Sequence, residues 1–137
     1  MKRYGWRRLA LAVEAAFWLL TAWLALRLVP FRFLVGTLSP RVTHPAPQGT
    51  ERRRIVRQVC WAVMAAARRF PIPIVCFPRA IAAQRMLARR GVATRLPYGV
   101  RRELDGSLLA HVWVDVDHVT VLGNPTTGFS IVTIFGK

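Results

Sequence analysis

The hydrophobic pattern of the chain changes its period once, near Gly91. Before this residue, apolar side chains recur every three or four positions, as Ile55, Val59 and Val63 do, which is typical of helices. After it, apolar and polar residues alternate, as in LLAHVWVDV at 108–116, which is typical of half-buried strands. Helices followed by a small antiparallel sheet make an α+β fold. Because 137 residues provide one hydrophobic core, we expect a single domain overall.

The N-terminal segment from Leu9 to Val29 is almost wholly apolar and close to the roughly 20 residues that span a bilayer. Glu14 and Arg27 interrupt it, and no cleavage pattern of a secretory signal follows it. We therefore expect a helix that is buried against the rest of the protein or lies on a membrane surface, with a true span as the alternative. Residues 1–40 form this hydrophobic segment, and residues 41–137 form the core of the domain.

Two further helices are predicted before Gly91. Thr50 is the expected N-cap of the first, which runs to Phe70 with an apolar line on one face and arginines on the other. Pro71 and Pro73 exclude regular helix between the two. The second helix carries Pro78 in its first turn and ends at Gly91 as a C-cap.

The net charge of +15 is concentrated in the predicted helices. Residues 1–102 carry twenty bases and two acids, whereas residues 103–136 carry four acids and no base. The arginines follow helical spacing without interleaved aromatic residues, so we expect no nucleic-acid binding. A docking face for an acidic peptide or an anionic lipid is the preferred interpretation. Two cysteines make no disulfide framework, which favours a cytoplasmic protein.

Cys76 is the candidate nucleophile because it lies at the N-terminal edge of a predicted helix. There the helix dipole and unpaired N–H groups favour a thiolate and can hold an oxyanion. Cys60 lies inside the arginine-faced helix between Val59 and Val63, and we interpret it as a small buried hydrophobe.

His111 is the candidate base. Alternation along its strand places Trp113 and Asp115 on the same face, which is an unusual composition for a purely structural core. A two-residue turn at Asp117 and His118 would pair Val116 with Val119, Asp115 with Thr120, Trp113 with Leu122, and His111 with Asn124.

Asn124 is then the expected orienter of the His111 ring, and Asp115 is its rival. Two residues along a strand separate Asp115 from His111 by about 6.6 Å, which favours Asn124. A bulge in the hairpin would shift the pairing by one and place Gly123 there instead. A metal site built from Cys76, His111 and Asp115 would lack a further ligand, so we expect no metal and no cofactor.

The string CFPRAIAAQRMLARRGVATRLPYGV, followed by LLAHVWVDV, resembles the transglutaminase-like, papain-related cysteine peptidases that remove the leader in lasso peptide maturation. The resemblance covers roughly residues 50–125. It implies that Cys76 is the nucleophile and His111 the base. The family usually has an Asp about a dozen residues beyond the His, where this chain reads Leu-Gly-Asn-Pro, so that either Asn124 or Asp115 completes the site.

The same resemblance implies a precursor peptide as substrate, a separate leader-recognition protein and an ATP-dependent lasso cyclase as partners. The basic helices are candidates for docking the leader-recognition protein. The alternative function is a non-catalytic adaptor that uses the Leu9 to Val29 helix and the arginine-rich surface at a membrane.

Overall fold

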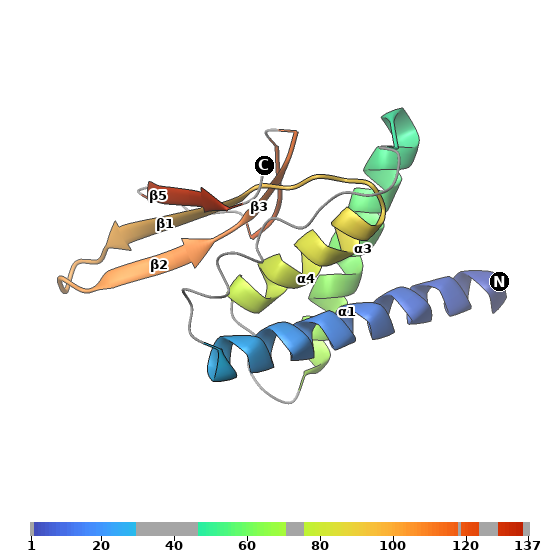
Figure 1. The fold of residues 1–137 in the computed structure, drawn as a ribbon, viewed down its shortest axis with the longest axis horizontal. Coiled ribbons are helices and arrows are strands. Elements are labelled where there is room, and N and C mark those ends of the chain that lie inside the picture. The colour runs from blue at the N-terminus through green and yellow to red at the C-terminus, as the bar shows by residue number, and fades with distance from the viewer. Residues whose placement is uncertain (1, 30–46, 71–75, 118, 124–128, 136–137) are drawn as a thin grey trace.

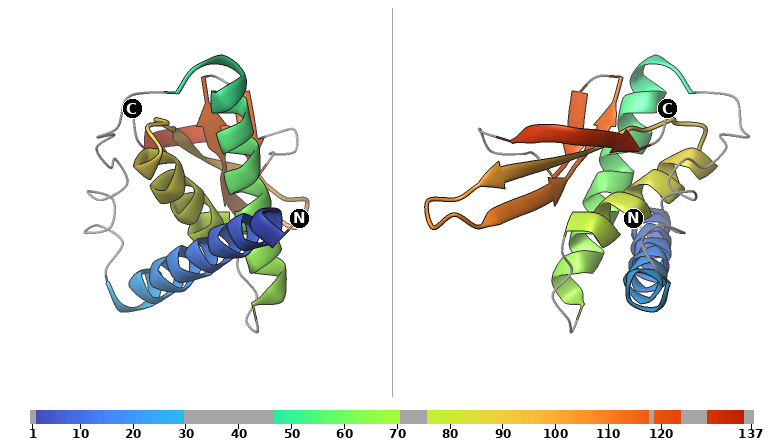
Figure 2. Two further views of the ribbon diagram at one scale, coloured as in Figure 1. Left: turned by 90° about the vertical axis from the view of Figure 1, so that its right-hand side faces the viewer. Right: turned by 60° about the vertical axis from the view of Figure 1, so that its left-hand side comes forward.

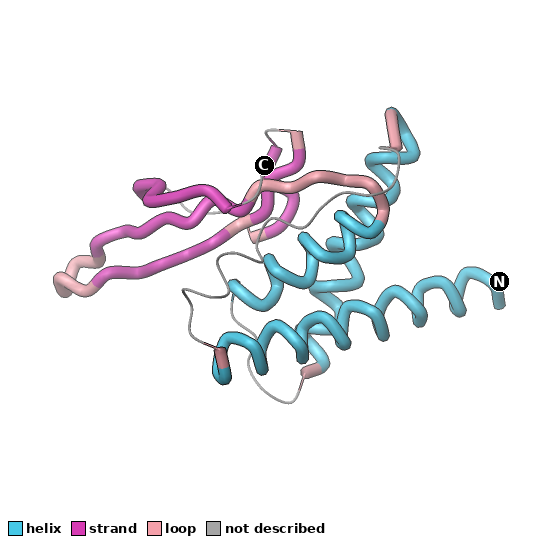
Figure 3. Tube along the Cα trace, viewed as in Figure 1, coloured by secondary structure: helices cyan, strands magenta, loops and turns pink. Residues whose placement is uncertain are grey.

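The structure, a computed structural model, describes residues 2–29, 47–70, 76–117, 119–123 and 129–135. Within these ranges helices come first and strands follow, and the two kinds of element occupy separate sides of the molecule (Figures 1 and 3). This order confirms the predicted α+β fold. The elements are α1 (Lys2–Leu28), α3 (Gly49–Arg69), α4 (Cys76–Arg89), β1 (Leu96–Arg102), β2 (Leu108–Val112), β3 (Val114–Val116), β4 (Val119–Leu122) and β5 (Ser130–Phe135).

The core lies where α1 crosses α3 and α4 (Figure 2). Many of the buried residues are alanines, whose small side chains let helix backbones approach closely. Larger side chains such as Leu19 and Met86 fill the space between them and are fully buried. The sheet closes this core from the strand side with Leu96, Val112 and Val114.

Helix α1 has two different faces. Ala15, Leu19 and Ala22 are buried in the core, which confirms the expected packing against the rest of the protein. The opposite face leaves large apolar side chains exposed, and we call them the α1 stripe: Trp6, Leu9, Val13, Phe17, Leu20, Leu24 and Leu28. By length and composition, the segment Trp6–Leu28 is also sufficient to cross a membrane.

An ion-pair cluster fixes α1 to the end of α4. Both carboxylate oxygens of Glu14 accept hydrogen bonds from Arg90, at 2.8 and 3.0 Å, and one also accepts from Arg89 at 3.0 Å. The hydrogen bond from Arg90 is the main cause that lowers the pKa of Glu14. The acid that interrupts the apolar segment therefore has a structural partner 76 residues away in the chain.

The ends of two helices test the capping predictions. Helix α3 begins at Gly49, after Gln48, so the prediction of Thr50 as N-cap is wrong. Gly49 has a φ of +62°, which lets the chain turn into the helix two residues earlier than predicted. Gly91 has a φ of +83°, and the N–H of Val92 donates to the carbonyl of Leu87 at 2.9 Å, which confirms the glycine C-cap.

Strand β1 organises the sheet. It pairs with β2 on one edge and β5 on the other, in the order β2-β1-β5 with both pairs antiparallel. The chain segment 108–116 is interrupted at Trp113, where one continuous strand was predicted. Two backbone hydrogen bonds between Arg95 and Asp115, at 2.8 and 2.9 Å, still hold β3 beside the residue that precedes β1. The β3–β4 hairpin is thereby attached to the main sheet.

Candidate active site

The N-terminal turn of α4 meets the end of β2. Cys76 is the first residue of α4, and its side chain lies outside what the structure describes. Arg79 and Ala80 follow it by three and four positions, on the same helix face, and line a cavity of about 60 Å³ together with His111. The fold therefore brings the helix start that carries Cys76 to the strand that carries His111.

The ring of His111 is held by a backbone carbonyl. Its Nε2 lies 2.7 Å from the carbonyl oxygen of Gly123. A carbonyl oxygen can only accept, so Nε2 carries the hydrogen and donates it. In the neutral ring the lone pair is then on Nδ1, which is the nitrogen available to take a proton from a thiol.

Two aromatic rings flank the imidazole. The ring of Trp113 stacks with it at a centroid distance of 6.0 Å, and Phe129 lies 5.8 Å away at a tilt of 42°. The guanidinium carbon of Arg101 sits 4.9 Å from the centre of the Phe129 ring. These contacts restrict the rotation of the imidazole around its hydrogen bond.

Gly99 provides the room for this arrangement. A Cβ atom at Gly99 would lie 3.2 Å from the Trp113 ring and 3.2 Å from the carbonyl oxygen of Ser130. Since such contacts are tighter than ordinary van der Waals distances, a side chain here would displace Trp113 or β5. Gly99 therefore lets the tryptophan lie against β1.

The hairpin register is partly as predicted. The pairs Val116–Val119 and Asp115–Thr120 are confirmed. The predicted pair Trp113–Leu122 is wrong, because a bulge between Val114 and Asp115 pairs Leu122 with Val114 instead. His111 pairs within the sheet with Gly99 of β1, so the argument that set Asn124 opposite it no longer follows.

Gly123 contacts His111 through its carbonyl, although the observed bulge lies on β4 and does not pair the two residues as the bulge alternative expected. Its φ of +73° turns the chain after β4, and a Cβ there would lie 3.3 Å from the carbonyl oxygen of Val112. This conformation directs the Gly123 carbonyl at His111 and explains why glycine stands at this position.

The structure describes only one of the two residues that were predicted to orient the His111 ring. Asn124 lies outside the described residues, and its role stays a prediction. The carboxylate of Asp115 accepts a hydrogen bond from the hydroxyl of Thr120 at 2.8 Å. Between the two described side chains of Asp115 and His111 there is no hydrogen bond, so Asp115 acts on the neighbouring strand rather than on the imidazole.

Sequence reasoning assigned no role to Arg79, which lines the His111 cavity. Its Nε is buried and has no hydrogen-bond partner among the described residues. The available signal was its place in the Cys-Phe-Pro-Arg string, three residues after Cys76. A buried donor at this place can bind a carbonyl or carboxylate oxygen of a ligand.

Cys60 has the properties of a structural cysteine. It is half-buried on α3, and burial raises the pKa of its thiol to about 11. The described residues hold no group of three or more His, Cys, Asp or Glu side chains that could bind a metal ion.

The comparison with protein families agrees with this arrangement. A model described as the transglutaminase-like superfamily matches residues 8–134, which include most of α1, the helix that begins at Cys76 and the described strands except the last residue of β5. Curated proteins and solved structures give no significant match. The match agrees with the observed α+β domain, in which a helix that starts with a cysteine packs against a strand that carries a histidine. The chain belongs to the transglutaminase-like superfamily.

Proposed function

We propose that this protein is a cysteine peptidase that removes the leader from a ribosomally made lasso peptide precursor. The observation that carries the proposal is the His111 ring, which a carbonyl holds in one tautomer beside the helix turn that begins at Cys76. Membership of the transglutaminase-like superfamily supports cysteine peptidase chemistry. The resemblance of 76–100 and 108–116 to leader peptidases supports the choice of substrate.

In the proposed reaction, the Cys76 thiol gives its proton to Nδ1 of His111 and the sulfur attacks the scissile carbonyl carbon. The C–N bond breaks as the imidazolium returns the proton to the leaving amine. Water then attacks the thioester, loses a proton to His111, and releases the carboxylate product and the thiol. Unpaired N–H groups in the first turn of α4 stabilise the oxyanion in both steps.

The roles of the surrounding residues follow from their contacts. Gly123 keeps the proton on Nε2, and Trp113 and Phe129 hold the ring plane. Arg79 offers a buried donor to the substrate backbone. The leader-recognition protein and the lasso cyclase are proposed partners in the cytoplasm, and the reaction needs no metal or cofactor.

The test incubates the purified chain with the precursor and its leader-recognition protein and follows the leader by mass spectrometry. We expect Cys76→Ala to abolish leader release and Ser107→Ala, a change of similar size at an exposed residue of the β1–β2 turn, to retain it. Release that survives Cys76→Ala would sink the mechanism.

The α1 stripe favours a second candidate function, a membrane-associated adaptor. Seven exposed apolar side chains recur at helical spacing on a strongly basic protein, as in helices that lie in the surface of anionic bilayers. Because Leu19 and Glu14 tie the other face to the fold, this helix would lie on the surface rather than cross it.

Co-sedimentation with phosphatidylcholine vesicles, with and without phosphatidylserine, tests the adaptor. Phe17→Glu on the stripe should reduce binding to the anionic vesicles, whereas Leu109→Glu, an equally charged change on an exposed β2 site, should not. No binding by the unmodified protein, or equal loss in both variants, excludes this second function.

A further inference from the structure

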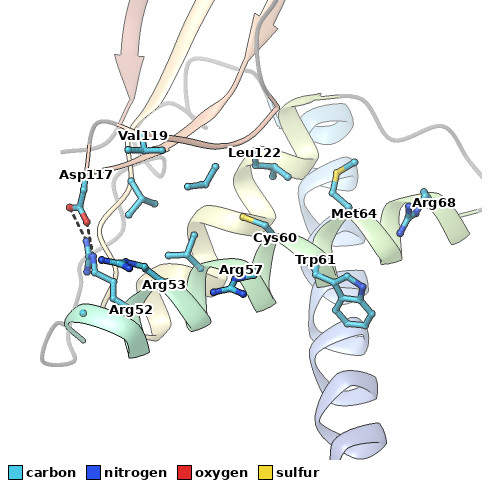
Figure 4. A pocket seen from close by; sticks show the side chains of 14 residues that line it. Arg52, Arg53, Arg57, Cys60, Trp61, Met64, Arg68, Asp117, Val119 and Leu122 are labelled. Atoms are coloured by element: carbon cyan, nitrogen blue, oxygen red, sulfur yellow. Dashed lines mark hydrogen bonds and ion pairs between the residues drawn. The ribbon is translucent and has the colours of Figure 1, made fainter.

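A groove of about 870 Å³ runs between α3 and the β3–β4 hairpin (Figure 4). Its volume is within the range of sites that bind ligands of a few residues. Its floor is apolar: Cys60 and Met64 point from α3 toward the hairpin, which supplies Val119, Val121 and Leu122. Since burial raises the pKa of Cys60 to about 11, the thiol in this floor is uncharged at neutral pH.

The rim of the groove is basic. Arg52 donates two hydrogen bonds to Asp117, at 2.7 and 3.1 Å, so these two charges compensate each other at one end. Three further arginines of α3 line the wall: Arg53, Arg57 and Arg68. A ligand with acidic side chains around apolar ones would match both the rim and the floor.

The groove adjoins the candidate active site. Met64 and Leu122 line the groove and also the small cavity that contains His111 and Gly123. A polypeptide bound in the groove would therefore end within one or two side chains of the imidazole. This continuity favours the substrate chain over an unrelated ligand.

We propose that the groove between α3 and the β3–β4 hairpin binds a stretch of the substrate polypeptide beside the scissile bond, rich in apolar and acidic residues. The proposal rests on the peptidase function proposed above and adds a substrate preference to it. Apolar side chains fill the floor, and carboxylates pair with Arg53, Arg57 and Arg68. The groove thus selects which part of a precursor reaches His111.

The test measures binding first, without catalysis. A fluorescein-labelled peptide of alternating Leu and Glu is titrated into the full-length Cys76→Ala protein, beside a Leu–Lys and a Ser–Glu peptide. We expect the Leu–Glu peptide to bind at least about tenfold more tightly than either control. Equal affinity for the Leu–Lys peptide would overturn the charge match, and equal affinity for Ser–Glu would overturn the apolar floor.

Variants then locate the binding site. Arg57→Glu in the wall and Val119→Glu in the floor should each weaken binding about tenfold, while Arg102→Glu, an exposed change of the same charge at the end of β1, should alter it less than twofold. Equal effects of Arg57→Glu and Arg102→Glu would place the peptide elsewhere. Competition by unlabelled precursor supports the substrate as occupant, and competition by the leader-recognition protein alone overturns it.

Cleavage separates this proposal from the proposed function. In protein that retains Cys76, Arg57→Glu should raise the KM for the precursor about tenfold and change kcat by less than twofold. Tight binding of the Leu–Glu peptide without any leader release would support peptide binding in the groove and refute the proposed peptidase function. Leader release that depends on Cys76 with KM unchanged in Arg57→Glu would refute the groove and leave the peptidase.

Discussion

The helical and the strand halves of the molecule are built for different tasks. In the helices, buried alanines and leucines pack α1, α3 and α4 into one core, and most of the basic side chains that the structure describes are exposed. In the strands, the burial is concentrated next to the helices, and the far end of the β1–β2 hairpin leaves Leu104, Leu108 and Leu109 exposed. The strand half instead uses glycines and a bulge to position His111. Stability thus depends mainly on the helices, and the site geometry on the strands.

The largest expected effect separates the two halves, because a change at His111 in the strand half should affect activity and not stability. His111→Gln removes the proton acceptor, and we expect the rate of leader release to fall about a thousandfold. Because the ring is only half-buried, the melting temperature should change little. Mass spectrometry of the product and calorimetry measure the two quantities, and undiminished release would contradict the role of His111.

The next effect is on stability alone. The Leu19 side chain is fully buried in the core, so Leu19→Ala should lower the free energy of unfolding by about 3 kcal/mol. Leu20, its neighbour on the α1 stripe, is 45% exposed, and Leu20→Ala is the matched control with an expected loss of about 0.5 kcal/mol. Urea denaturation measures both, and equal losses would show that α1 is not part of the core.

A third effect joins the two halves. Gly123→Ala forces a side chain into a left-handed conformation and toward the Val112 carbonyl, which should cost about 2 kcal/mol. It should also shift the carbonyl that holds His111 and slow leader release about tenfold or more.

Gly106→Ala is its control. Gly106 has a φ of +90° in the β1–β2 turn, and a Cβ there meets no atom within 4 Å. It should lose stability from the same backbone strain while leader release stays within twofold. Equal slowing in both variants would mean that strain, rather than the Gly123 carbonyl, determines the rate.

Acid should weaken the contact between α1 and the end of α4. The pKa of Glu14 is lowered in the folded protein from its ordinary value of 4.5, so below that value the unfolded chain binds more protons. The stabilisation from Glu14 is therefore complete above pH 4.5 and is lost as the pH falls through the folded pKa.

Glu14→Gln should remove that dependence and lower stability at neutral pH by about 2 kcal/mol. Melting curves between pH 7 and 3 compare Glu14→Gln with the unmodified protein. Glu103→Gln is the control, because the Glu103 carboxylate pairs with Arg101 in the strand half. An unmodified protein and a Glu14→Gln variant with parallel pH profiles would exclude the linkage.

The smallest effect is expected at the tip of the strand half. Leu109→Thr changes an exposed side chain and should alter the free energy of unfolding by less than about 0.5 kcal/mol. A loss as large as that of Leu19→Ala, in the same urea titration, would mean that the hairpin end is covered in solution.

Local chemistry made much of the molecule predictable. The period of apolar residues set the helices and strands, Gly91 ended α4, and the turn after Val116 paired Val116 with Val119. Each of these depends on residues within one or two turns of chain, where propensity and sterics act directly. The exposed arginines of α3 and its buried Val59 and Val63 follow from the same periodicity.

The candidate site was predictable in its residue types and less so in its geometry. Cys76 and His111 stood out because a helix start and a strand face are local features. The partner of His111, the Gly123 carbonyl, was harder to predict, because its position depends on a bulge that shifts β4 by one residue against β3. The Cys-Phe-Pro-Arg string marked Arg79, but its place in the His111 cavity depends on how α4 packs on β2 and β3.

By itself the sequence determined the order and type of the elements, the polarity of each helix face and the residues able to do thiol chemistry, because these are properties of short stretches. Only the tertiary structure decided that a glycine carbonyl holds the imidazole, that Glu14 binds the end of α4, and that a basic groove adjoins the site. These contacts join residues far apart in the chain, and their geometry depends on backbone bends and side-chain volumes summed over the whole core.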